Sequence, residues 1–286
     1  MKRFEGCWHR IDRATVHRNA SISEWNAFLD QEPYETRLTQ DYNKAEWTLW
    51  IEQTIPMPPG IALNLGEWLY QLRGALDNCV YEVAIYDSGS DPPPNHDRLE
   101  FPIHDRLGSF RRAAKHKLAP LSDKHRSWIE SVQPFQPGDD GKVIPERTVL
   151  YWVNELARID RHRSLHVVGA YVAESDPLVR APAASSIAIT NLSAEGPIFV
   201  DGDGEIARIQ IAPWAEGDDV EANAQTALDP ELREWTERKP APEFWERLTF
   251  GERLRFFELF VKAIIGRFER DCTGWTRVDE LLKPET

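Results

Sequence analysis

A run of apolar side chains between residues 60 and 86 constrains the fold more than any other feature of this chain. Its large apolar residues recur at steps of three and four, namely Leu65, Trp68, Leu69, Leu72, Leu76, Cys79 and Val83. That period is typical of an α-helix with one buried face. Prolines and a glycine cluster at 56–60, so the sequence predicts a long helix that begins there and ends near Tyr86.

Other segments carry the same helical period. They are 11–30, 109–116, 122–132, 146–164 and 249–270. Ser122 is a suitable N-cap residue, and Thr249 with Glu252 has the spacing of a capping box. Ser21 and Glu24 have that spacing too, which indicates that the first helix restarts there. The last helix is apolar on more than one face and is therefore expected to lie centrally.

A period of two marks the strands. Within 34–54, Trp47, Leu49 and Ile51 alternate with more polar neighbours, and Asn43 and Lys44 supply a turn, so this segment is a predicted β-hairpin. Short β-branched runs follow at 166–173, 186–192, 197–200 and 205–212. They predict a small, mostly antiparallel sheet. Residues 213–247 are rich in acid and proline and predict an irregular covering segment with one short helix near 230–237.

These elements predict an α+β fold with a helical body, a β-hairpin, a small antiparallel sheet and a closing C-terminal helix. The helical body is expected to take residues 1–165 and 248–286, with a β-rich region at 166–247 packed on it. The hairpin at 34–54 is grouped with the body, with the β layer kept as the alternative. Eight residues are predicted to share one core: Trp68, Leu72, Leu76, Val83, Val153, Leu156, Phe257 and Val261.

Composition limits the classes of function. The chain of 286 residues is 41% hydrophobic, enough for a sizeable core, and its formal charge of -13 repels polyanions, so nucleic acid is expected to bind weakly. No apolar run approaches the roughly 20 residues that cross a bilayer, and the first residues lead into no signal-peptide stretch. We therefore expect a cytoplasmic protein without a membrane partner.

Common cofactor and metal motifs are missing from the sequence. Three widely spaced cysteines argue against disulfides and zinc knuckles, and there is no phosphate-binding loop or nucleophile elbow. His96, His104, His116 and His125 lack ligand spacing and are expected at the surface. The acidic segment 201–205 fits a hairpin turn better than a calcium loop. The sequence thus predicts neither a metal nor a cofactor.

Four charged residues sit on or beside apolar helix faces. Arg73 and Asp77 are one turn apart in one helix, and Asp160 and Arg163 continue the apolar face of another. Charges in such places need partners, so we expect a buried cluster that is structural more readily than catalytic. If so, Asp160 contacts Arg73 or Arg163, and an Asp160→Ala change costs roughly 3–5 kcal/mol.

The segment that holds Arg161, His162 and His166 resembles the Arg-x4-6-His signature of HEPN ribonucleases. This resemblance implies helical domains that dimerise and cleave RNA without a metal. Its histidine would move a proton while the arginine steadies phosphate charge. The other reading is a solvated helix end whose cations complement the helix dipole.

A broader resemblance covers roughly the first 165 residues. The motifs are Leu72–Asn78, Phe101–Ile103, Gln133–Phe135 and Ile159–Arg163. They resemble those of uncharacterised bacterial proteins, from which Asn78 and Arg161 depart by replacing a histidine and a lysine. That group implies a fold but no activity. We therefore expect a non-enzymatic binding or interaction protein, with a possible homodimer, and keep the HEPN-like ribonuclease as the alternative.

Overall fold

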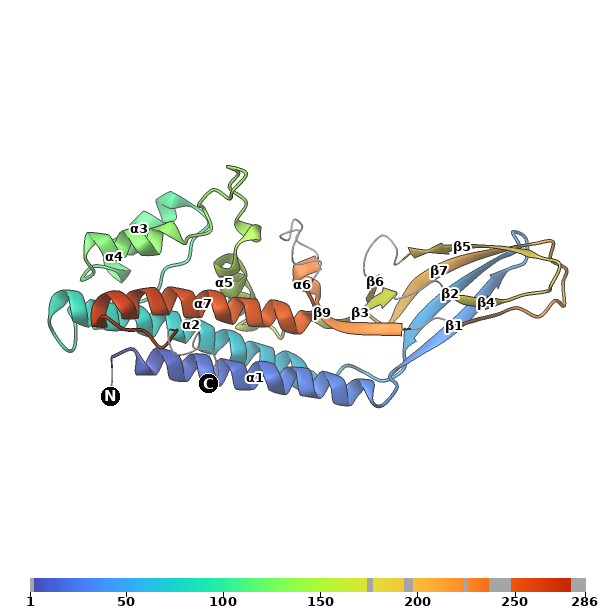
Figure 1. Ribbon diagram of the computed structural model, residues 1–286, viewed down its shortest axis with the longest axis horizontal. Coiled ribbons are helices and arrows are strands. Elements are labelled where there is room, and N and C mark those ends of the chain that lie inside the picture. Colours follow the sequence, from blue (N-terminus) through green and yellow to red (C-terminus); the bar gives the residue numbers. More distant parts are fainter. Residues whose placement is uncertain (1–2, 174–176, 193–197, 224–225, 237–247, 279–286) are drawn as a thin grey trace, which may run out of the picture. The chain divides into compact units, whose positions relative to one another are not determined.

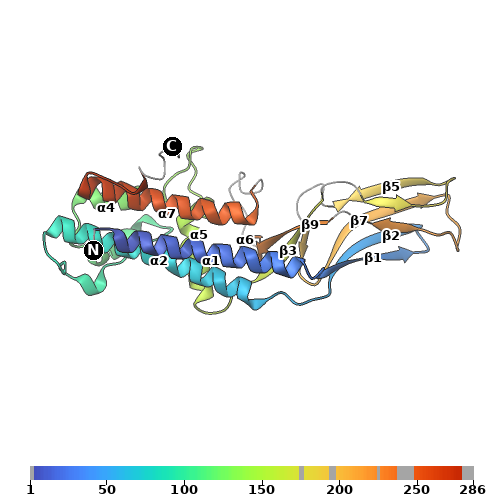
Figure 2. The same cartoon turned by 60° about the horizontal axis from the view of Figure 1, so that its bottom comes forward.

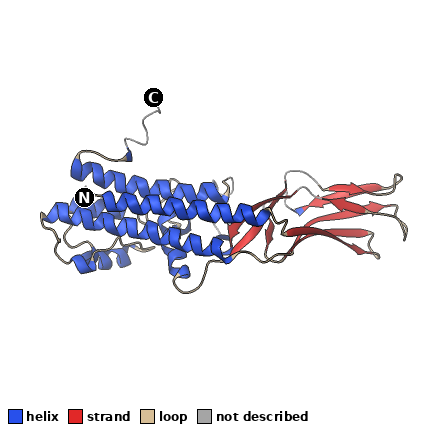
Figure 3. Cartoon of the chain, turned by 90° about the horizontal axis from the view of Figure 1, so that it is seen from below, coloured by secondary structure: helices blue, strands red, loops and turns tan. Residues whose placement is uncertain are grey.

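The computed structural model describes residues 3–173, 177–192, 198–223, 226–236 and 248–278, and it has the predicted α+β fold. The chain divides into two compact units. Residues 1–22, 60–165 and 234–286 form the helical unit, and residues 23–59 and 166–233 form the β unit. Helices and strands are correspondingly segregated in Figure 3.

The helical unit is built on three long helices, α1 (Glu5–Leu29), α2 (Pro59–Ser88) and α7 (Phe250–Thr273), which lie side by side in Figures 1 and 2. The last turns of α1 belong to the β unit. The shorter helices are α3 (Leu107–Lys117), α4 (Asp123–Ser131), α5 (Val149–Asp160) and α6 (Arg233–Thr236), with 3-10 turns η1 (His96–Arg98) and η2 (Pro145–Arg147). Within the described residues, no helix is both long enough and apolar enough to cross a bilayer.

The helical periods of the sequence locate the core correctly. All eight residues predicted for it are buried in the helical unit, each with at most 1% of its surface exposed. Two predicted caps are confirmed. The Ser122 hydroxyl accepts from the His125 N–H at the start of α4, and Thr249 and Glu252 form the capping box of α7.

A buried carboxylate joins the three long helices. Glu258 of α7 is 1% exposed, and its Oε1 accepts a hydrogen bond from Trp68 Nε1 of α2 at 3.1 Å. Its Oε2 accepts from Thr15 Oγ1 at 3.0 Å and from Arg18 Nη1 at 2.8 Å, both on α1. One side chain therefore holds α1 and α2 against α7.

The strands of the β unit form three small antiparallel sheets. The largest has the order β1 (Tyr34–Asp41), β2 (Glu46–Gln53), β7 (Asp203–Ala212) and β5 (Ser186–Asn191). The second has the order β6 (Ile198–Val200), β3 (Val167–Ala173) and β9 (Thr226–Leu232), and the third pairs β4 (Leu178–Arg180) with β8 (Glu221–Asn223). Between β6 and β7, Gly202 has a φ of 92°, and Asp201 bridges to Asp203, so the predicted turn is confirmed.

The hairpin β1–β2 belongs to the β unit, so its grouping with the helical body is wrong and the alternative, the β layer, holds. β2 pairs with β7 along nearly its whole length, with Trp47 opposite Ile209. The alternate residues Trp47, Leu49 and Ile51 are buried against Ile209 and Ile211. A two-stranded hairpin cannot cover such an apolar face alone, so it takes further strands as neighbours.

Three other boundaries differ from the sequence predictions. α1 starts at Glu5 and passes Ser21 without a break, because the buried Ser21 hydroxyl donates to the Ile61 carbonyl instead of capping a helix. α5 is shorter than predicted and ends at Asp160. Residues 226–232 form β9 and pair with all of β3, where a covering segment was expected, while 237–247 lie outside the described residues.

We predict that Glu258→Ala lowers the free energy of unfolding by about 3–5 kcal/mol, because Arg18 and the Trp68 N–H lose their buried acceptor. Urea melts of both proteins measure the difference. Glu67, which is exposed on α2, provides the control, and Glu67→Ala should stay within about 0.5 kcal/mol of the parent. Equal losses in the two variants would contradict a central role for Glu258.

Candidate functional site

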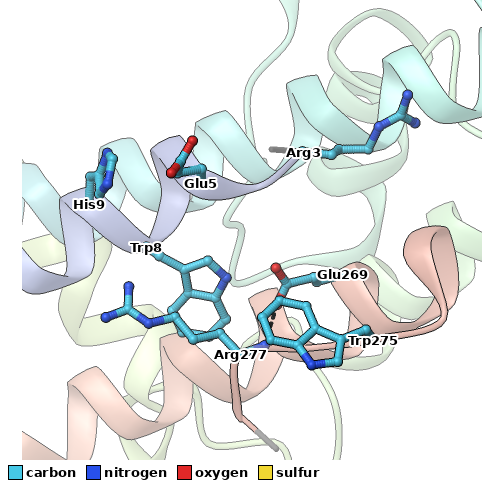
Figure 4. Close-up of a pocket in the computed structure, with 7 residues that line it drawn as sticks. All are labelled: Arg3, Glu5, Trp8, His9, Glu269, Trp275 and Arg277. Atoms are coloured by element: carbon cyan, nitrogen blue, oxygen red, sulfur yellow. Dashed lines mark hydrogen bonds between the residues drawn. The ribbon is translucent and has the colours of Figure 1, made fainter. Parts of the chain in front are cut away.

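A hollow of about 210 Å³ lies in the helical unit between the first turns of α1 and the end of α7 (Figure 4). We call it the tryptophan pocket. Its lining residues are Arg3, Glu5, Trp8, His9, Glu269, Trp275 and Arg277.

The chain makes this pocket by turning back on itself. α7 ends at Gly274, whose φ of 74° lies in the left-handed region, where a side chain is unfavourable. The returning residues, 275–278, then pack against α7 at Gly266, and Thr276 is fully buried there. A Cβ at Gly266 would lie 2.6 Å from Val278 Cγ2, so this glycine lets the returning residues approach.

Arg277 fixes the returning residues to both helices. Its backbone N–H donates to Glu269 Oε2 of α7 at 2.9 Å, drawn as a dashed line in Figure 4. Its guanidinium donates to both Asp12 oxygens of α1, at 3.0 and 3.3 Å, and lies 5.7 Å from the centre of the Trp8 ring. The charge of Arg277 is therefore already neutralised by Asp12.

Within the described residues, one buried polar group of the pocket has no hydrogen-bond partner and a second has only one. Trp8 is 4% exposed, and its Nε1 is buried and makes no hydrogen bond with the described residues. Glu269 is 2% exposed, and among these residues its carboxylate accepts only from the backbone N–H of Arg277. In Figure 4 the indole nitrogen of Trp8 points toward Glu269. An orphaned buried donor costs free energy, so the pocket offers hydrogen bonds that it does not use internally.

A second hollow of about 270 Å³ lies beside the Phe101–Ile103 motif and is lined by Ile103, His104, Asp105, Pro134, Tyr151, Asn154 and Glu155. No buried side-chain nitrogen or oxygen of these residues lacks a hydrogen bond. Burial, followed by the charge of Lys117, lowers the pKa of His104. The tryptophan pocket is therefore the stronger candidate for a ligand site.

The motif residues Arg73, Asp77 and Gln133 hold the backbone next to this second hollow. Arg73 Nη2 donates to the Phe101 carbonyl at 3.2 Å, and the Phe101 N–H donates to Asp77 Oδ1 at 2.9 Å. The Gln133 amide donates to Pro102 at 2.8 Å and accepts from the His104 N–H at 3.0 Å. Three of the sequence motifs thus form one hydrogen-bonded structure, in which Arg73 and Asp77 bind backbone.

The predicted four-residue charged cluster does not form. Arg73 lies 3.6 Å from Asp77 and 3.4 Å from Glu100, whereas Arg163 is exposed and lies 3.5 Å from Glu234. Asp160 is half-buried against Gly66 and makes no ion pair with the described residues. Gly66 precedes Arg73 by seven residues, or about 10 Å along a helix, so Asp160 meets α2 out of reach of Arg73.

The residues of the Arg-x4-6-His segment have separate surroundings. Arg161 and His162 are exposed in the helical unit, where Arg161 Nε donates to the Ala157 carbonyl at 3.3 Å. His166 belongs to the β unit, and its Nε2 lies 3.2 Å from Asp201 Oδ1. Since α5 ends at Asp160, His166 does not share a helix with Arg161.

His125 is not at the surface, contrary to the sequence prediction. It is 2% exposed, with Nδ1 2.7 Å from Asp87 of α2 and Nε2 3.0 Å from Asp271 of α7. Both ring nitrogens of His125 thus lie within hydrogen-bonding distance of a carboxylate, one from each of these helices. Hydrogen bonds from Lys124 and His125 lower the pKa of Asp271. The cluster fixes the end of α7, close to the pocket.

The sequence analysis missed Trp8 and Glu269, the two residues that distinguish this pocket. Trp8 lies outside the helix predicted for 11–30, although Cys7, Trp8 and Ile11 already follow a helical period and are all buried. Glu269 lies just before Arg270, the predicted end of the last helix, and no pattern in the sequence singled it out. No family model, curated protein or solved structure matches this chain significantly, so the resemblances noted from its motifs stay predictions.

Replacing Asp160 was expected to destabilise the protein, but its surroundings indicate the opposite effect. Burial, followed by the charge of Glu67, raises the pKa of Asp160. A carboxyl with a raised folded pKa contributes stability below its unfolded pKa and loses it as the pH rises through the folded pKa. At pH 7 the ionised Asp160 is therefore destabilising.

We predict that Asp160→Asn unfolds at the same urea concentration as the parent or a higher one at pH 7. The difference should vanish below pH 3.8, the ordinary aspartate pKa. Asp139→Asn, at an exposed loop position, is the matched control. A loss of about 3–5 kcal/mol in Asp160→Asn at pH 7 would instead show a buried ion pair.

Proposed function

We propose that this chain is a non-enzymatic binding protein that holds a small ligand in the tryptophan pocket. The observation that carries the proposal is the buried indole N–H of Trp8, a lining residue, which makes no hydrogen bond within residues 3–173, 177–192, 198–223, 226–236 and 248–278 and points toward Glu269 (Figure 4). Native proteins rarely leave such a donor without an acceptor. A ligand that brings an acceptor would satisfy it.

The size and walls of the pocket suit a small ligand. Its volume of about 210 Å³ lies below the range of drug-sized ligand sites, so it suits only a small ligand. Trp275 is 43% exposed and presents an aromatic face, and a large apolar side chain at the surface beside polar groups is typical of a binding site.

The state of the three cysteines argues against covalent catalysis by a thiolate. Burial raises the pKa of Cys7 and Cys79 well above the ordinary value, and raises that of Cys272 to about 12. All three thiols are therefore protonated near neutral pH, whereas a cysteine nucleophile acts as the thiolate. The residues that line the pocket include no cysteine.

We predict that a subset of a diverse library of small polar compounds shifts the indole N–H signals of Trp8 and Trp275 in NMR spectra of the full chain. Trp8→Phe and Trp275→Phe assign the two signals. The indole of Trp214, a residue of the β unit, serves as the internal control and should not move. If no compound moves the Trp8 or Trp275 signal selectively, the proposal fails.

The alternative, RNA cleavage without a metal by Arg161 and His166, is separated from ligand binding by a second assay. The full chain, Arg161→Ala and His166→Ala are each incubated with single-stranded RNA in the presence of a chelator. Under our proposal the three proteins leave the RNA equally intact. Cleavage by the parent that both substitutions abolish would instead establish the ribonuclease.

A further inference from the structure

We infer that the ligand of the tryptophan pocket is a small organic ammonium ion with a hydroxyl or carbonyl oxygen near its charge. This inference rests on the proposed binding function and specifies its ligand class. Three properties of the pocket lead to it: the charge of Glu269, the indole faces and the Trp8 donor.

The first property is a buried carboxyl group that forms no ion pair within the described part of the chain. Glu269 is 2% exposed and forms no ion pair with the described residues. Arg277 gives Glu269 only its backbone N–H and directs its guanidinium to Asp12. A carboxylate removed from water is costly unless a positive charge neutralises it. A cationic ligand would supply that charge.

The second property is the pair of indoles. Trp8 and Trp275 both line the hollow, and the ring of Trp8 already attracts the Arg277 guanidinium at 5.7 Å. Tryptophan faces attract cations more strongly than other aromatic rings do. Trp275 is 43% exposed, so its ring remains accessible to a ligand.

The third property is the donor in the same wall. The Trp8 N–H is buried and needs an acceptor, which an ammonium group alone does not provide. A hydroxyl or carbonyl oxygen close to the charge would accept this hydrogen bond while the charged end contacts Glu269.

Other ligand classes fit less well. An anion would meet Glu269 and Glu5 in the lining, on a chain with a formal charge of -13. Of the lining cations, Arg277 is paired with Asp12, and Arg3 lies 5.8 Å from the centre of the Tyr86 ring. A neutral ligand would leave the buried carboxylate without a counter-charge.

The test compares choline and ethanolamine with 3,3-dimethylbutan-1-ol, which has the shape of choline but no charge, and with propionate as an anion. Binding to the full chain is measured by calorimetry. We expect at least one of the two ammonium probes to bind, and to bind at least about tenfold more tightly than the neutral alcohol. Propionate should not bind.

Two substitutions link the binding to the named groups. Glu269→Gln removes the charge but keeps an acceptor for the Arg277 N–H, so it should weaken ammonium binding about tenfold while stability is kept. Glu67→Gln removes an exposed charge on α2 and should have no effect. Trp8→Phe removes only the N–H donor and part of the ring, so it should weaken choline binding more than binding of tetramethylammonium, which has no oxygen.

The outcomes separate this inference from the proposed function. Equal binding of choline and its neutral analogue, or preferred binding of propionate, would overturn the ammonium assignment. The same holds if library compounds shift the Trp8 and Trp275 signals but neither ammonium probe binds. In each of these cases the proposed binding function still holds if library compounds shift the Trp8 or Trp275 signal. If no compound and no probe moves either signal, both proposals fall together.

Discussion

The buried carboxylate of Glu258 is the interaction on which the helical unit depends. It binds Trp68, Thr15 and Arg18 at once and so sets how α1 and α2 lie along α7. The pocket follows from that alignment. Trp8 lies seven residues before Thr15, or about 10 Å along α1, and Glu269 lies eleven residues after Glu258, or about 16 Å along α7. A helix is stiff over such lengths, so a contact in the middle of the unit determines which side chains meet at its end.

The sequence predicted those parts of the fold that depend on local period and capping. The α2 and α7 faces and the caps at Ser122 and Thr249 are as expected, because each is set by residues within a few turns. The pairing partners of the strands could not be predicted from such local patterns. A period of two shows that Trp47, Leu49 and Ile51 share a face, but it does not show which distant segment covers that face or pairs with the free edge. β9 was missed because its acid and proline content resembles that of a loop.

The candidate site shows the same division. Arg73 and Asp77 were correctly identified as charges that need partners, and their partners include the backbone of Phe101. The helical period places Asp160 on an inward face, but it does not show which residue of α2 lies opposite. Asp160 packs against Gly66 instead of Arg73. His125 is buried because two carboxylates from distant helix ends surround it, which spacing around residue 125 cannot reveal. Trp8 was missed because the first helix was expected to begin at residue 11.

Each unit is built from stretches that are far apart in the sequence, and this has a consequence for folding. The bond between Thr15 and Glu258 joins residues 243 positions apart, and the residues that pair between β2 and β7 are 151 to 164 positions apart. Contacts of such sequence separation carry a large loop-closure entropy, and chains rich in them fold slowly. During synthesis α1 and α2 would emerge long before α7, with the apolar faces of both still uncovered. A nascent chain of this protein therefore has a long interval in which aggregation competes with folding, and chaperones are expected to matter most before α7 leaves the ribosome.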